Sequence, residues 1–93
     1  MSHTFEELVA KQRAADEAHT RVEQLRAAYG PPAQERWTGM QSETYETALR
    51  AWRDLARDLQ TALNEYANHE ARPRAEIEAE VERAARPAGQ EGP

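Results

Sequence analysis

The chain has 93 residues, enough for one domain, and 31% of them are charged against 39% hydrophobic, so the apolar residues must be concentrated in narrow stripes to form a core. The formal net charge of −5 argues against a nucleic-acid partner, because neutralising phosphates requires a basic surface. The absence of cysteine excludes disulfide bonds and thiolate metal sites, and no stretch approaches the roughly 18–20 consecutive apolar residues of a membrane span.

The first predicted element is a helix over residues 4–29. Thr4 and Glu7 have the spacing of a capping box, in which each side chain satisfies a backbone amide of the other residue. Apolar or small residues then recur at helical spacing: Leu8, Ala15, Ala18, Val22, Leu25 and Tyr29. Gly30 can adopt the left-handed conformation that ends a helix, and the prolines at 31 and 32 cannot continue it.

A second helix is predicted over residues 40–72, after a turn at 30–39 in which residues 33–36 fit either a loop or a short helical turn. Thr38 and Gln41 have the spacing of a second capping box. Steps of three and four then give an unbroken apolar seam: Tyr45, Ala48, Trp52, Leu55, Leu59, Ala62 and Tyr66. A second apolar line runs beside it, through Leu49, Ala56 and Leu63. Pro73 breaks or kinks this helix, because proline has no amide hydrogen to donate.

Beyond Pro73 the apolar pattern is sparse. Residues 73–86 contain two large apolar side chains, Ile77 and Val81, one helical turn apart. This segment can form a short helix but has too little apolar area to fold alone. Residues 87–93 are expected to be a disordered tail.

These patterns predict an all-α fold in which two long helices form an antiparallel hairpin. One apolar stripe of the second helix can face the first helix, and the other would stay in water. Soluble proteins rarely leave such a patch uncovered, so we expect a dimer that forms a four-helix bundle. The expected interface residues are Tyr45, Leu49, Trp52, Leu55, Leu59 and Leu63. A second copy or a related hairpin would bury this stripe equally well.

Trp37-Thr38-Gly39 precedes the second helix, and Tyr66 and Glu70 close it as Tyr-x-x-x-Glu. With the aromatic and leucine seam between them, these motifs resemble the Trp-x-Gly family of small type VII secretion substrates, the early-secreted-antigen-like proteins. The resemblance covers residues 5–70. It departs from the family pattern in the loop at 30–36, which is longer than a bare Trp-x-Gly turn, and in Pro73, which interrupts the tail early.

The resemblance implies a helical hairpin, a four-helix-bundle dimer and export driven by an FtsK/SpoIIIE-type ATPase. In the family, the Trp-x-Gly turn of one subunit lies near the Tyr-x-x-x-Asp/Glu end of its partner, and together they form an export signal. The residues carried over are Trp37, Gly39, Tyr66 and Glu70. Since the chain has both this signal and a tail, it looks like the culture-filtrate-antigen-like subunit of a heterodimer. Ile77 and Val81 would then contact the ATPase.

Each of these residues also has a simpler interpretation. Trp37 can be an aromatic plug over the end of the bundle, and Gly39 can serve the tight turn. Tyr66 can end the apolar seam, and Glu70 can be a solvated side chain. Without Trp37 upstream, the simpler interpretation of Tyr66 and Glu70 would be favoured.

The sequence contains no pattern typical of an enzyme. We find no nucleophile–base pair, phosphate-binding glycine loop or paired catalytic carboxylates, so we expect neither catalysis nor a cofactor nor a small-molecule substrate. The three histidines are scattered, and the pairs His19/Glu23 and Glu65/His69 supply only two metal ligands each. We therefore expect no metal.

The first ten residues lack the basic and apolar regions of a secretory signal peptide. We expect synthesis in the cytoplasm and secretion without a cleaved signal. The rival hypothesis is a cytoplasmic helical-bundle adaptor or structural dimer that is never exported.

Overall fold

The protein, described here as a computed structural model over residues 3–30 and 37–87, is all-helical. Its helices are α1 (Phe5–Tyr29), α2 (Gly39–Glu70) and α3 (Arg74–Ala85). The predicted all-α class is confirmed. The ambiguous stretch at 33–36 and nearly all of the predicted disordered tail at 87–93 lie outside the described residues. Within the described ranges, no helix is both long and apolar enough to cross a membrane.

Both long helices begin with the capping boxes that the sequence predicts. The Thr4 hydroxyl accepts a hydrogen bond from the Glu7 amide at 3.1 Å, and the Glu7 carboxylate accepts one from the Thr4 amide. At α2, the Thr38 hydroxyl accepts from the Gln41 amide and the Gln41 side chain accepts from the Thr38 amide, both at 3.0 Å. At the start of each of the two helices, two amides that would otherwise be unpaired thus find local partners.

The helix ends depart in part from the sequence pattern. Gly30 ends α1 with a φ of +86°, as a glycine can, but its ψ of −177° lies outside the left-handed helical region. The second helix, predicted to extend to 72, ends at Glu70, because the next residue, Ala71, takes the left-handed conformation with φ 54° and ψ 43°. The Arg72 amide then bonds back to the Ala67 carbonyl at 3.1 Å. Arg72 directly precedes Pro73, and a residue in that position disfavours helical angles, so the helix does not continue through 72.

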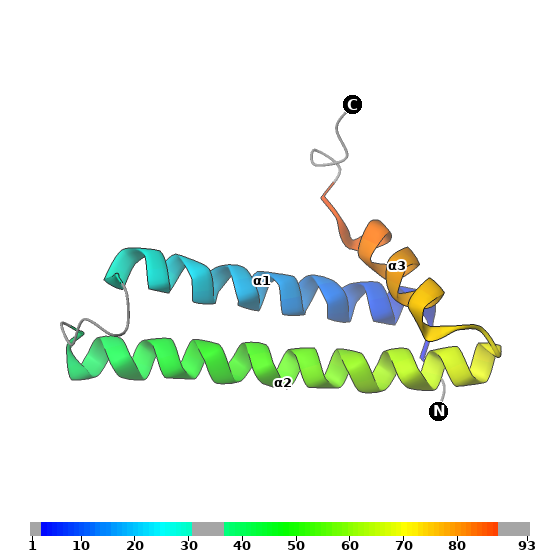
Figure 1. The fold of residues 1–93 in the computed structure, drawn as a ribbon, viewed down its shortest axis with the longest axis horizontal. Coiled ribbons are helices and arrows are strands. Elements are labelled where there is room, and N and C mark those ends of the chain that lie inside the picture. Colours follow the sequence, from blue (N-terminus) through cyan, green and yellow to red (C-terminus); the bar gives the residue numbers. More distant parts are fainter. Residues whose placement is uncertain (1–2, 31–36, 88–93) are drawn as a thin grey trace.

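Helices α1 and α2 lie side by side and run in opposite directions (Figure 1). After a short connection at 71–73, α3 turns back and packs against both of them, at the end of the molecule where α1 begins and α2 ends (Figure 1). The main core lies where the three helices meet and consists of Leu8, Ala15, Leu59, Ala62, Leu63, Ala67, Ile77 and Val81. Further toward the loop, Val22 and Leu25 of α1 are also buried. No buried polar or charged residue occurs in the described part of the chain.

Candidate recognition surface

Trp37 lies in an aromatic cluster that joins the end of α1 to the start of α2. Its ring meets Tyr29 edge-on with centroids 5.2 Å apart, and Tyr45 edge-on at 5.0 Å. Both geometries are favourable for aromatic pairs. Arg26 donates a hydrogen bond from Nη2 to the Tyr45 hydroxyl at 3.0 Å, which raises the pKa of Arg26. The cluster therefore fixes the two helices to each other near the loop.

The indole nitrogen of Trp37 is a polar atom within this cluster that finds no partner among the described residues. Nε1 is buried and has no hydrogen-bond acceptor among the described residues. Native proteins pair most buried donors, so this N–H lacks, within the described chain, the acceptor that a buried donor usually has. Gly39 follows as the first residue of α2 and is exposed, with open space where a Cβ would be.

Tyr66 and Glu70 lie at the far end of α2 from Trp37 (Figure 1). At about 1.5 Å of rise per residue, Tyr66 is roughly 40 Å from Gly39. Tyr66 is half-buried against the main core, while Glu70 is exposed at the last helical position. The two pairs of candidate residues therefore do not form one site within a single chain.

Ile77 and Val81 occupy positions that differ most from the expectation. Both side chains have 0% exposure and belong to the main core, together with Leu63 of α2 and Leu8 of α1. From the sequence we expected these two side chains to contact the ATPase, in a segment with too little apolar area to fold alone. In this fold neither side chain is exposed, because α3 packs on the other two helices, which supply the missing apolar area.

Polar contacts lie at both ends of α3, and those at its C-terminal end join it to α1. At its start, Arg72 bonds to Glu76 at 3.3 Å and to Glu80, forming a bridge that spans two turns. This bridge lowers the pKa of the Glu80 carboxyl, principally through the hydrogen bond from the guanidinium, and it raises the pKa of Arg72. At its end, Arg13 of α1 donates hydrogen bonds to the carbonyls of Ala84 and Ala85 at 3.2 and 3.3 Å. A positive charge at this end also complements the negative pole of the helix.

The expected dimer interface is divided between two environments. Leu59 and Leu63 are buried in the chain's own core, with 4% and 0% exposure. The members nearer the loop are half-buried: Tyr45, Leu49, Trp52 and Leu55. Trp52 lies against the His19 ring with centroids 4.7 Å apart. Among large apolar residues of the described chain, Met40 is the exposed one, at 77%. The protein thus covers much of the stripe that the sequence assigned to a partner.

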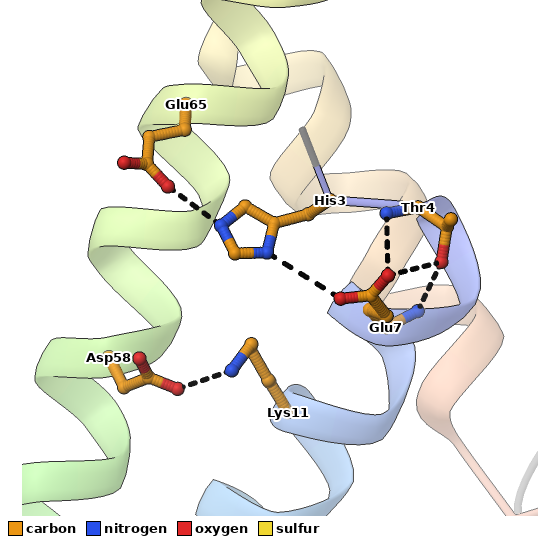
Figure 2. Close-up of polar contacts among 6 residues, drawn as sticks. All are labelled: His3, Thr4, Glu7, Lys11, Asp58 and Glu65. Carbon is orange, nitrogen blue, oxygen red and sulfur yellow. Dashed lines mark hydrogen bonds and ion pairs between the residues drawn. The ribbon is translucent and has the colours of Figure 1, made fainter. Parts of the chain in front are cut away.

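His3 and Lys11 link α1 to α2 along a polar edge (Figure 2). His3 Nε2 is 2.7 Å from a Glu65 carboxylate oxygen, and its Nδ1 is 3.7 Å from Glu7. Lys11 Nζ lies 2.6 Å from Asp58. Sequence reasoning missed these contacts, because they join residues 62 and 47 positions apart. In the parts of the chain that are described, no group of three His, Cys, Asp or Glu residues is placed to hold a metal ion.

Comparisons of the chain with known protein families, with curated proteins and with solved structures gave no significant match in any of the three.

Proposed function

We propose that this protein is a type VII secretion substrate that dimerises with a related helical hairpin and is recognised by an FtsK/SpoIIIE-type ATPase. The proposal names Trp37 and Gly39 as one half of the export signal, and Tyr66 and Glu70 as the other half. A heterodimer is the favoured assembly, and a homodimer is the alternative. The chain itself performs no catalysis in this proposal.

The observation that carries the proposal is the placement of two short motifs at the two ends of one helix. Trp-x-Gly opens α2 and Tyr-x-x-x-Glu closes it. Each motif alone is common, but their conjunction in a small helical chain is specific. An antiparallel partner would place its own Tyr-x-x-x-Glu end beside this chain's Trp37, which removes the separation of roughly 40 Å that α2 imposes on them.

The exposed Glu70 and the orphan indole N–H of Trp37 support a recognition role for the two ends. Glu70 is exposed at the last position of α2. The Trp37 N–H is buried and lacks an acceptor within the described chain; in the proposal, assembly shifts the ring so that it donates to a group of the partner. In the proposal, the assembled dimer displays both halves together, and Ile77 and Val81 contact the ATPase as an i,i+4 pair.

Secretion of tagged variants from a bacterium that carries a type VII system tests the proposal. Tyr66→Ala and Glu70→Gln should lower the amount in the culture filtrate at least tenfold at equal cell-associated levels. Glu46→Gln is the matched control, because Glu46 is another exposed glutamate of α2, and it should be exported like the wild type. Equal filtrate levels for all variants would refute the export signal.

The second candidate is a cytoplasmic adaptor or structural bundle that is never exported, and one observation favours it. With α3 packed on the core, the chain leaves Met40 as the exposed large apolar side chain of the described residues. A chain so covered can be stable without a partner. Failure of the wild-type chain to reach the filtrate of a secreting host, with normal accumulation in the cells, would support this candidate.

A further inference from the structure

Helix α3 covers the same apolar surface that a second hairpin would use. Leu59 and Leu63, expected at the dimer interface, are buried in one cluster with Ile77 and Val81. The packing of α3 on the core therefore blocks two events. One is the packing of a partner on Leu63, and the other is the contact of Ile77 and Val81 with another protein. Either event requires α3 to leave.

The attachment of α3 is of a kind that opens locally. It is a helix of 12 residues, and helices of this length are marginal without tertiary packing. Its described contacts with the core rest on two large side chains, and its bridges through Arg72 are partly exposed to solvent and so contribute little each. The connection at 71–73 gives it a hinge. Elements with few apolar contacts open far more often than the whole chain unfolds.

The apolar line beneath α3 continues beyond it and is symmetric. Leu49, Ala56 and Leu63 are seven residues apart, so they lie along one line of α2. Leu63 is buried, whereas Leu49 and Ala56 are half-exposed. In an antiparallel pair of α2 helices that cross at Ala56, Leu49 of each copy lies opposite Leu63 of the other. The small side chain at the centre allows close approach, and the pattern is self-complementary, as a two-fold interface requires.

We propose that α3 is a displaceable cover of this line, and that a second copy of the chain displaces it by packing α2 against α2 about Ala56. The closed form is a monomer with Ile77 and Val81 hidden. The open form is a dimer in which both side chains become accessible. The displacement of α3 makes recognition of Ile77 and Val81 by the ATPase conditional on dimerisation. In that respect this inference rests on the proposed function.

Two double variants of the full chain, matched in charge, test the proposal. Arg13→Gln with Glu80→Gln removes the hydrogen bonds that join α3 to α1 and the bridge that joins α3 to Arg72. Lys11→Gln with Asp58→Asn removes an α1–α2 ion pair in which no residue of α3 takes part. Hydrogen exchange of amides 77–85 reports opening, and light scattering over a concentration series reports mass. The first variant should exchange at least tenfold faster in α3 and dimerise at a concentration at least tenfold lower than the wild type. The second should match the wild type in both measurements.

A further substitution tests the line itself. Ala56→Glu, added to the Arg13→Gln and Glu80→Gln variant, should abolish dimerisation. The amides of α3 should still exchange fast, and far-UV circular dichroism should show that α1 and α2 remain helical. If Ala56→Glu disturbs the fold, Leu49→Gln serves in its place.

Two results would overturn the proposal: an open variant that stays monomeric at every concentration, or a dimer in which α3 keeps its full protection. Neither result bears on whether Tyr66→Ala lowers secretion. Conversely, a second copy could displace α3 in a chain that is never secreted. Each of the two proposals can therefore fail without the other.

Discussion

Replacing Ile77 by alanine tests whether packing of α3 depends on its buried side chains. Ile77 is completely buried in the core and is one of two large apolar residues in α3. Truncation removes several methyl and methylene groups and leaves a gap at the contact between α3 and the other helices. The expected result is release of α3 from the core while α1 and α2 stay folded.

The magnitude follows from the complete burial of the side chain. Truncating a buried isoleucine to alanine typically costs about 2–5 kcal/mol. The lower value corresponds to a shift of roughly 30-fold in the equilibrium between docked and released α3, at about 1.4 kcal/mol per factor of ten. The loss of global stability cannot exceed the free energy with which α3 docks, since a released helix no longer contributes. We therefore expect the free energy of α3 docking to fall by more than the free energy of unfolding of the whole chain.

Hydrogen exchange with mass spectrometry measures the local effect, and urea unfolding followed by circular dichroism measures the global one. Amides of α3 should exchange about 30-fold faster or more, and those of α1 near Val22 and Leu25 should change little. Met40→Ala is the control, because it truncates a large side chain that is 77% exposed, and it should change the unfolding free energy by less than about 0.5 kcal/mol.

The reasoning fails if Ile77→Ala leaves the exchange of α3 within about threefold of the wild type. Such a result would mean that burial of Ile77 does not hold α3 in place. Equally slow hydrogen exchange in all three helices of Ile77→Ala would also contradict the reasoning, because α3 would then open only when the whole chain unfolds.

Ala71→Gly should raise the free energy of unfolding by about 0.5–1 kcal/mol, because Ala71 has a φ of 54° that costs less for glycine; a lower urea midpoint would contradict this. Trp37→Phe should keep the edge-on contacts and stay within about 0.5 kcal/mol of the wild type, whereas Trp37→Ala should lose roughly 2 kcal/mol in the same assay. Because the bridge to Arg72 lowers the pKa of Glu80 in the folded chain, its stabilisation should be present above the ordinary carboxyl value of 4.5 and be lost as the pH falls below it. Unfolding midpoints of wild type and Glu80→Gln should converge at low pH, and Glu82→Gln, at an exposed position of the same helix, should show no such trend.

The local elements of this protein were predictable because their signals lie close together in the sequence. The two capping boxes each involve residues three apart, and both form as expected. The seam of α2 repeats every three or four residues, which is sufficient to define a helix and its apolar face. The motifs at the ends of α2, Trp37 and Tyr66 among them, could also be read from spacing alone. The export role assigned to them stays a prediction.

The ends of helices and the distant contacts were less predictable. Ala71 has no local signal for the left-handed conformation, which glycine or asparagine would have provided. The partners of His3 and Lys11 depend on how α1 and α2 are aligned, and several alignments satisfy the same apolar pattern. The aromatic cluster around Trp37 depends on that alignment too.

The sequence by itself determined the all-helical class, the start of each long helix and the position of the break at Pro73, because propensity, capping and proline geometry act over a few residues. Only the tertiary structure decided where α3 goes. A helix with two apolar residues has no preferred partner in its own sequence, and its position follows from the free apolar surface that α1 and α2 leave at one end of the pair. For that reason Ile77 and Val81, which were expected from the sequence to contact a partner protein, are buried in the fold.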